Sequence, residues 1–262
     1  MYKSIAISNE KGGVAKTTTT LSLGAALAEL GNKVLLIDLD AQANLTLALG
    51  IEPGSSEITS SEIMLDNVPL LDARRSTEVP NLDLIPSSSR IETSEQYLPM
   101  RTNHLSILED AIRSSGKLPY NYILMDCPPA LGSITKNALG AADMLIIPTQ
   151  AEYFSAYALR NMMTLIRTIR EQVNSNLAYR ILVTMMDRRN KTHRNIHEQL
   201  RSTFAEGVFN TVIEIDTKLR ESPIAGLPIT QYRSGARGST QYRVLAQELM
   251  EYAQEDENRQ EA

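Results

Sequence analysis

One turn near the amino end constrains the fold more than any other feature of the sequence. The residues before it, Lys3–Asn9, read as a short apolar strand. The residues after it, Thr17–Leu30, read as a helix that ends at Gly31. A turn in this position lies at a helix N-terminus, where unpaired backbone N–H groups and the helix dipole attract anions. The sequence therefore predicts an α/β fold with an anion-binding turn.

The turn also carries the residue types that hold phosphate groups. Gly12 and Gly13 let the backbone approach phosphate oxygens closely. Lys16 has the length to reach the β- and γ-phosphates of a nucleotide, and the Thr17 hydroxyl is a ligand for Mg²⁺. A lysine-rich surface turn before a helix is the alternative, and the strand–turn–helix context favours the nucleotide site.

The turn departs from the general phosphate-loop pattern, G-x-x-x-x-G-K-[ST], at both glycine positions. Glu10 and Ala15 occupy these positions. Because a Cβ atom penalises a left-handed backbone, Ala15 predicts a negative φ angle there. A second lysine, Lys11, lies at the start of the turn, although an ordinary loop of this kind needs only Lys16.

Two further apolar segments end in carboxylates, Lys33–Asp40 and Tyr122–Asp126. Their continuous apolarity indicates strands that are buried on both faces of a parallel sheet. Their C-terminal ends then lie at the edge where α/β proteins bind ligands. For each segment alone, a carboxylate that caps a strand end in solvent is the alternative. A Rossmann dinucleotide fold is a rival, but it needs G-x-G-x-x-G, which the turn lacks.

Taken in order, three motifs resemble those of the ParA/MinD family of ATPases. Lys11–Thr18 resembles the deviant Walker A motif, K-G-G-x-x-K-[ST]. Asp38–Asn44 resembles the D-x-D-P-Q motif, with Ala41 in place of proline, and Tyr122–Ala130 resembles the Walker B region. The resemblance implies a doubly wound, mostly parallel sheet with helices on both faces, which is the P-loop NTPase fold of the deviant Walker A type.

The same resemblance implies ATP and Mg²⁺ as cofactors and a homodimer as the active form. Lys11 is expected to reach the phosphates of the partner's ATP, and Lys16 those of its own chain. Asp38 is expected to position or activate the attacking water, and Asp126 to join the Mg²⁺ shell. The expected catalytic residues are Lys11, Lys16 and Asp38. The expected metal site consists of Thr17, Asp38 and Asp126. The expected ATP contacts are Lys11, Gly12, Gly13, Val14, Ala15, Lys16, Thr17, Thr18, Met186, Asp187 and Pro223.

The adenine end of the site is predicted from weaker motifs. Val183–Asp187 resembles the family's strand beside the base, which makes its last two residues candidates. Packing of Met186 in the core is the alternative. Leu219–Pro223 resembles the loop that closes over the base. The family usually has proline and asparagine near Glu214 and Asp216, so base contacts from that loop stay open.

The net charge is −5, yet positive charge gathers in one part of the chain. Residues 185–243 contain 10 Lys/Arg and 6 Asp/Glu, and the rest contains 16 and 25. Such a patch can hold DNA phosphates without reading sequence. Relatives bind nonspecific DNA through this half when they are dimeric. The candidates by position are Arg189, Lys218, Arg220 and Arg237. Arg237 belongs to a family R-G motif for which a structural role is equally expected, and a solvated basic face is the alternative for each residue.

Cysteine content and the C-terminal tail separate the chain from some relatives. Cys127 is the only cysteine, whereas nitrogenase-type iron proteins need two cluster cysteines and iron–sulfur carrier ATPases need Cys-x-x-Cys. The tail is acidic and frayed from about residue 255, unlike the basic amphipathic helix with which MinD-like proteins bind membranes. Without an apolar run of membrane length or a signal peptide, a cytoplasmic protein is expected.

The rest of the sequence is consistent with one ATPase domain over residues 1–262. The stretch from about 50 to 103 departs most from alternation and has no assigned chemistry. Strands are expected near 81–86, 120–126, 143–148, 179–185 and 211–215. Helices are expected near 104–115, 133–141, 155–173, 192–205 and 239–254.

The resemblance implies a slow ATPase that dimerises with ATP, binds nonspecific DNA and associates with the nucleoid. A ParB-like or other cargo adaptor would stimulate hydrolysis, and the cargo would be plasmid or chromosomal DNA. One alternative is the same mechanism with a protein organelle as cargo, such as a carboxysome or a chemoreceptor cluster. Another is an ATP-gated regulatory module with negligible hydrolysis, which the departures at Ala15 and Ala41 keep open.

Overall fold

The computed structural model describes residues 2–54, 58–153 and 155–261, and of residues 255–261 it describes the backbone alone. Eight strands form one sheet in the order β3-β4-β2-β5-β1-β6-β7-β8, and only the β3–β4 pair is antiparallel. The strands are β1 (Lys3–Ile7), β2 (Val34–Asp38), β3 (Arg75–Ser76), β4 (Leu82–Ile85), β5 (Tyr122–Asp126), β6 (Met144–Gln150), β7 (Ala178–Met186) and β8 (Val208–Glu214).

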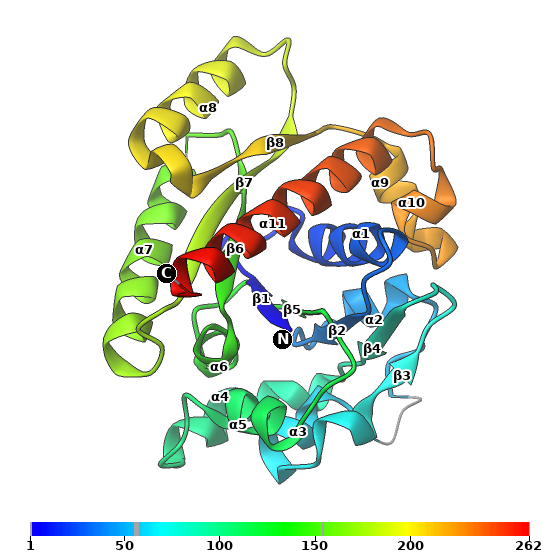
Figure 1. Ribbon diagram of the computed structural model, residues 1–262, viewed down its shortest axis with the longest axis vertical. Helices are drawn as coiled ribbons and strands as arrows, with labels where there is room; N and C mark the ends of the chain where they lie inside the picture. Colours follow the sequence, from blue (N-terminus) through cyan, green and yellow to red (C-terminus); the bar gives the residue numbers. More distant parts are fainter. Residues whose placement is uncertain (1, 55–57, 154, 262) are drawn as a thin grey trace.

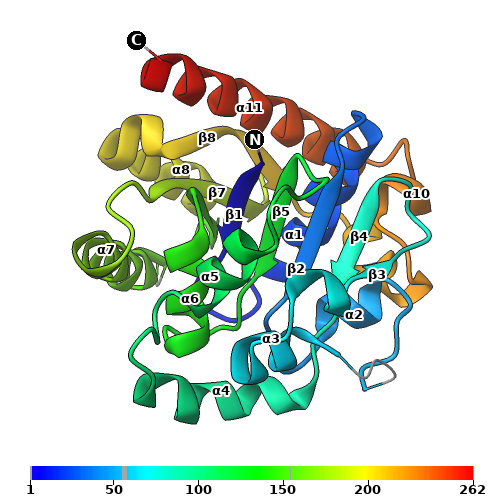
Figure 2. The ribbon, with the colours of Figure 1, turned by 60° about the horizontal axis from the view of Figure 1, so that its bottom comes forward.

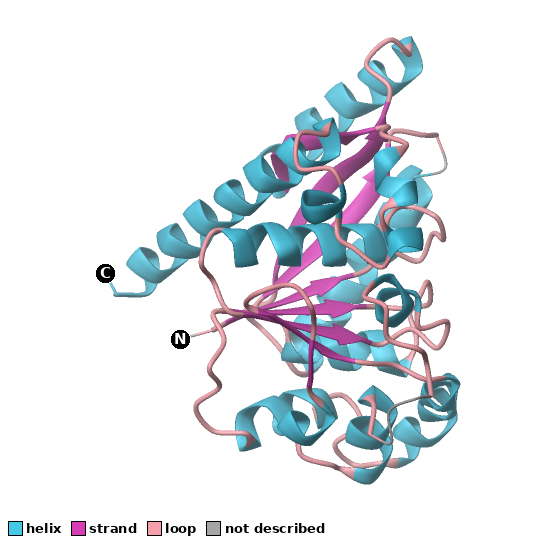
Figure 3. Ribbon diagram, turned by 90° about the vertical axis from the view of Figure 1, so that its right-hand side faces the viewer, coloured by secondary structure: helices cyan, strands magenta, loops and turns pink. Residues whose placement is uncertain are grey.

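Helices cover both faces of the sheet, as the sequence predicted (Figures 1 and 3). One face is packed by α3 (Ser60–Asp66), α5 (Ile107–Ser114), α6 (Ser133–Ala141), α7 (Ser155–Gln172) and α8 (Lys191–Phe204). The other is packed by α1 (Lys16–Glu29), α2 (Asn44–Ala48), α9 (Lys218–Glu221), α10 (Ile229–Tyr232) and α11 (Arg237–Glu261). The doubly wound prediction is confirmed.

The order of the strands brings the three predicted motifs together. The central strand β1 pairs with β5, and β5 pairs with β2. The register places Asp126 opposite both Ile7 and Asp38, so the ends of these strands are level. All five residues of β2 and of β5 are buried, which explains why both segments are continuously apolar until their final carboxylate.

The C-terminal helix α11 also satisfies the open edge of β8, which is the last strand of the sheet. Glu248 accepts hydrogen bonds from the backbone N–H groups of Asn210 (2.6 Å) and Thr211 (2.9 Å). Gln241 accepts one from the N–H of Glu214 (3.0 Å). Because unpaired strand edges invite pairing with other chains, these side chains close an edge that would otherwise be exposed.

The stretch from 50 to 103, in which a strand near 81–86 was predicted, has β4 in that place. It also contains α3, β3, the short helix α4 (Glu92–Tyr97) and 3₁₀ turns at Leu70–Ala73, Ser89–Ile91 and Leu98–Met100. One prediction needs correction at the level of the fold. Helix α11 continues to Glu261, past the point near 255 where fraying was predicted. The acidic side chains there lie outside the described part. Among the described residues, no helix is both long and apolar enough to cross a membrane.

Candidate functional site

The predicted phosphate turn runs from the end of β1 to the first residue of α1. Gly13 has a φ angle of +73°, and a Cβ atom on Gly12 or Gly13 would meet nothing within 4 Å, so open space lies before the helix N-terminus. Val14 holds the turn in place, because its side chain is buried in the core and its carbonyl accepts a hydrogen bond from the Thr184 hydroxyl (3.1 Å). The turn is thus fixed from β7, while its glycines face the opening.

Ala15 corrects the backbone prediction, because its φ angle is +69° and not negative. Its position explains the left-handed conformation. Its carbonyl accepts the first helical hydrogen bond, from the Thr19 N–H (2.9 Å), while the preceding residue is held in the core. The chain must therefore turn from the buried Val14 into the helix within one residue, and the left-handed backbone of Ala15 makes this turn. A second alanine, Ala43, has φ +50° at the start of α2, where the Asp38–Asn44 motif turns into a helix.

Lys16 places a nearly buried ammonium group at this helix end. The residue is 8% exposed, and its Nζ donates a hydrogen bond to the carbonyl of Lys11 (3.2 Å). Burial lowers the pKa of Lys16, since a desolvated ammonium is less stable. It forms no ion pair with any described residue. A buried cation in this state is well suited to an anionic ligand.

Asp126 lies beside this group and receives two hydroxyl groups from α1. Thr17 donates to its Oδ2 (2.7 Å) and Thr20 to its Oδ1 (3.1 Å). Burial, and next the nearby Asp38, raise the pKa of Asp126 above its ordinary value. The structure thus brings Thr17 and Asp126 into direct contact, as two ligands of one metal ion would require.

Asp38 and Asp40 lie in different environments. Asp38 is fully buried and accepts hydrogen bonds from the Thr46 N–H (2.9 Å), the Thr46 hydroxyl (2.7 Å) and the Asp40 N–H (3.1 Å). Burial raises the pKa of Asp38, and these hydrogen bonds oppose the rise. Asp40, two residues further on, is the carboxylate of this motif that lines the cavity at the phosphate turn.

The turn opens into a cavity of about 560 Å³. Many of the predicted ATP contacts line it: Gly12, Gly13, Ala15, Lys16, Thr17, Thr18 and Pro223. Sequence reasoning missed Pro129, which follows Asp126, and it missed Leu47 and Ile224 at the apolar side. It also gave no role to Gln42 and Asn44, which are part of the motif after Asp38 and line the same cavity.

Lys11 lies on the other side of the turn. It lines a second cavity of about 560 Å³ with Glu10, Pro129, Leu131 and Tyr157, among others. Its Nζ forms an ion pair with Glu152 (2.6 Å) and donates a hydrogen bond to Gln150 (3.0 Å), at the end of β6. Pro129 lines both cavities, so the segment after Asp126 forms the wall between them.

The base end of the site differs from the prediction by one residue. Met186 is 4% exposed and belongs to the core, which was the alternative for it. Met185, with a φ angle of +52°, lines the cavity at the phosphate turn and a small adjoining one of about 50 Å³. Asp187 forms an ion pair with Arg189 (3.2 Å) at the end of β7. A strand alternates its faces, so the sequence could not decide which methionine turns outward without the exact end of β7.

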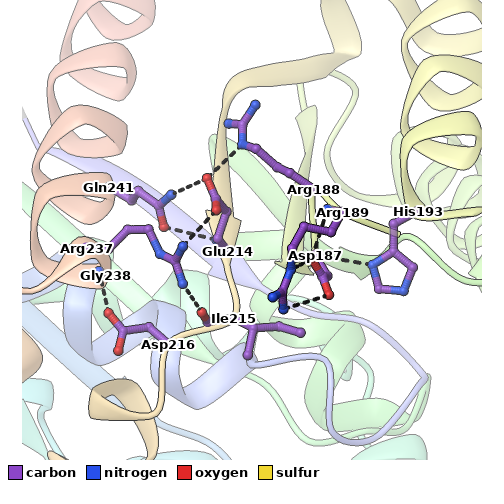
Figure 4. Close-up of polar contacts among 10 residues, drawn as sticks. All are labelled: Asp187, Arg188, Arg189, His193, Glu214, Ile215, Asp216, Arg237, Gly238 and Gln241. Carbon is purple, nitrogen blue, oxygen red and sulfur yellow. Dashed lines mark hydrogen bonds and ion pairs between the residues drawn. The ribbon is translucent and has the colours of Figure 1, made fainter. Parts of the chain in front are cut away.

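Most of the predicted DNA-binding residues are paired with acids of the same chain. Figure 4 shows two of them, Arg189 and Arg237, near the ends of β7 and β8. Arg237 forms an ion pair with Glu214 (3.0 Å) and donates to the Ile215 carbonyl. Glu214 also pairs with Arg188 (2.7 Å). The remaining candidates are on α9, where Lys218 pairs with Glu221 (2.6 Å) and Arg220 is exposed.

These contacts divide the four candidates by environment. The Arg189 side chain is 93% exposed, whereas Arg237 bridges α11 to the segment after β8. Asp216 supports the same junction by accepting hydrogen bonds from the N–H groups of Gly238 and Lys218, each at 2.9 Å. The contacts of Arg237 therefore favour a structural role for it, whereas Arg189 is the more accessible cation.

Comparison with known proteins identifies the family. A family model described as an AAA domain matches residues 2–179. The chain is 38% identical over 250 residues to the sporulation initiation inhibitor protein Soj of Bacillus subtilis, covering 95% of this chain and 98% of that protein. It is also 38% identical to the chromosome partitioning protein ParA of Caulobacter vibrioides, covering 94% and 93%.

A solved structure agrees with these relatives in fold. Cobyrinic acid a,c-diamide synthase from Mycobacterium smegmatis, solved with an ATP analogue and magnesium, superposes with a TM-score of 0.85 at 29% identity. The match covers 97% of this chain and 96% of that one. Sequence, fold and the three motifs around one cavity all agree: the chain belongs to the ParA/MinD family of deviant Walker A ATPases, with Soj and ParA partitioning proteins among its relatives.

Proposed function

We propose that this protein is a ParA-type ATPase that binds ATP and Mg²⁺, dimerises around them, and in that state binds DNA without reading its sequence. A ParB-like or other cargo adaptor then stimulates slow hydrolysis, which returns the chain to the monomer. Repeated cycles would segregate plasmid or chromosomal DNA. The protein would reside in the cytoplasm and associate with the nucleoid while ATP is bound.

The cavity at the phosphate turn fits a nucleoside triphosphate with Mg²⁺. At its phosphate end lie the turn before helix α1, which has no side chains at Gly12 and Gly13, and the ammonium of Lys16. The described residues contain no cluster of three His, Cys, Asp or Glu side chains that could hold a metal. Thr17 and Asp126 instead suit Mg²⁺, which takes one or two protein ligands and otherwise waters and substrate phosphates. Bound there, Mg²⁺ would neutralise charge on the β- and γ-phosphates.

The single observation that carries the dimer proposal is the position of Lys11. A lysine that served its own phosphate site would extend into the cavity at the phosphate turn, as Lys16 does. Lys11 instead lines the second cavity, and its Nζ contacts Glu152 and Gln150 at the end of β6. From there it can meet the phosphates of a second chain facing this one. A cation supplied across an interface would make phosphoryl transfer depend on dimerisation.

The ion pair with Glu152 is compatible with that movement. The two side chains are 28% and 49% exposed. Pairs of this exposure typically contribute about 0–1 kcal/mol, because solvent and salt screen them. A polyphosphate with bound Mg²⁺ in the partner would attract Lys11 at least as well as one screened carboxylate does. Lys11 would therefore exchange Glu152 for the partner's nucleotide at little cost.

The proposal of DNA binding rests on the distribution of positive charge. Arg188, Arg189 and Arg237 gather at one end of the sheet, and two such sets in a dimer would present a broader positive surface. The contacts to Asp187 and Glu214 reduce that charge in the single chain. Phosphates would have to compete with these acids, which favours weak, salt-sensitive and sequence-independent binding.

The proposal is tested with Lys11→Ala and with Lys117→Ala as a matched control, since Lys117 is an exposed lysine before β5. Light scattering with a non-hydrolysable ATP analogue measures dimerisation, and phosphate release with DNA and adaptor measures hydrolysis. We expect Lys11→Ala to bind ATP yet lose both dimerisation and stimulated hydrolysis. Unchanged dimerisation would refute the role of Lys11. A wild-type dimer that forms without measurable turnover would favour the regulatory module instead.

A further inference from the structure

The start of α6 is capped by a side chain from a different helix. The first N–H groups of a helix have no partner within it and need an acceptor. Glu95 of α4 supplies both of its oxygens: Oε2 accepts from the Ser133 N–H (2.6 Å) and Oε1 from the Ile134 N–H (3.1 Å). The residue that precedes α6 is Gly132, which has no side chain with which to cap the helix itself.

Gly132 and Glu95 are fitted to each other. Gly132 has φ −82° and ψ −163°, a conformation that any residue adopts, so the backbone does not demand glycine. A Cβ atom at this position would, however, overlap the Glu95 carboxylate, which would have to shift. A side chain on residue 132 would push the carboxylate off the helix end.

The capped end of α6 also fixes the segment that follows Asp126. Thr135, in the first turn of α6, donates its hydroxyl to the carbonyl of Ala130 (2.6 Å). The fully buried Asn137 donates to the carbonyl of His104 (2.6 Å), which ties α6 to the segment before α5. Figure 2 shows α4, α5 and α6 as neighbours on one side of the sheet. The start of α6, the segment 127–132 and the α4–α5 region therefore form one connected unit.

That segment is the wall between the two cavities. Pro129 lines both cavities, and Ala130 and Leu131 line the cavity that contains Lys11. We propose that Glu95 is a positioning residue of the ATPase site, which holds the wall at residues 129–131 by capping α6. The inference rests on the proposed function, and it gives a role to the stretch before residue 103, which the sequence left without one. Adaptor-stimulated hydrolysis across the dimer would require the wall to stay in place.

The test compares Glu95→Ala with Glu62→Ala. Glu62 is a capping carboxylate of the same region, but it caps its own helix α3 by accepting from the Thr59 N–H (2.7 Å). Hydrogen exchange in the nucleotide-free protein reports on the wall, and kcat with the dissociation constant of ATP reports on the site. We expect Glu95→Ala to speed exchange over residues 127–134 and to lower kcat about tenfold, with ATP affinity within about twofold, since small misplacements of reacting groups cost rate more than binding. Glu62→Ala should do neither, although both variants lose a cap.

A second pair of variants tests the fit itself. Gly132→Ala should reproduce the effects of Glu95→Ala, and the double variant should be no worse than either single one, because removal of the carboxylate makes room for the methyl group. Glu95→Gln should recover part of the rate, since its carbonyl can still accept one hydrogen bond. Unchanged exchange in Glu95→Ala, or equal loss of kcat in Glu62→Ala, would overturn the inference. A wild-type protein without ATPase activity would refute the proposed function, and the exchange data would still decide the role of Glu95.

Discussion

Ala15 gives the sharpest test of the phosphate turn, because the sequence and the structure predict opposite signs for Ala15→Gly. At φ +69°, an alanine pays a steric cost of about 1–2 kcal/mol, which glycine removes. Glycine in turn adds about 0.4–1 kcal/mol of conformational entropy to the unfolded chain. The Ala15 methyl group is only half-buried and lines the cavity, so little packing is lost. The free energy of unfolding should rise by about 0.5–1 kcal/mol.

Urea unfolding of the nucleotide-free protein measures this change as a shift of the midpoint at constant m-value. The melting temperature should rise by about 1–4 °C. The control, Ala253→Gly, lies in right-handed helix α11 and should lower stability by about 0.5–1 kcal/mol. Ala43→Gly should be nearly neutral, since Ala43 is strained at φ +50° but loses about 0.8 kcal/mol of methyl burial. If Ala15→Gly destabilises the protein as Ala253→Gly does, the left-handed turn is wrong.

Three further predictions concern the catalytic cycle. Glu152→Gln removes the ion pair that holds Lys11. The affinity of ATP-dependent dimerisation, measured by sedimentation, should therefore rise by up to about fivefold. A weaker dimer would place Glu152 in the interface instead. Asp38→Ala should retain ATP binding and stop turnover, as measured by phosphate release, and normal turnover would remove this carboxylate from the reaction. The double variant Arg189→Ala, Lys218→Ala should weaken DNA binding and reduce its salt slope by about one for each DNA phosphate that it no longer binds. As a control, Arg113 is an exposed arginine of α5 that is paired with Glu109. Arg113→Ala should leave both the affinity for DNA and the salt slope unchanged.

The phosphate end of the site was predictable because its chemistry is local. Lys11–Thr18 is one turn between a strand and a helix. The strands that end in Asp38 and Asp126 are apolar throughout, and this composition indicates that they are buried. The structure confirms that these segments meet, since the register aligns the strand ends. Where prediction failed, the deciding contact was distant in sequence. Ala15 takes a left-handed backbone because Thr184 and the core hold the residue before it.

The base end and the basic surface could not be resolved in the same way. Whether Met185 or Met186 faces the cavity depends on where β7 ends and twists, and an error of one residue reverses the face. The charge of Arg237 gave no sign that Glu214, 23 residues earlier, neutralises it. Counting cations therefore overstated the positive patch, because side chains from separate strands and helices pair only after the sheet forms.

By itself, the sequence determined the class of fold, the phosphate-binding turn, the second lysine and the two carboxylate-ended strands, since each depends on short-range periodicity and residue chemistry. Only the tertiary structure decided that Asp40 lines the cavity while Asp38 is buried behind it, that Lys11 lies outside its own cavity, and that Glu95 caps the helix after Asp126. These are contacts between elements far apart in the chain. Packing fixes them, and no local pattern encodes which side chains will meet.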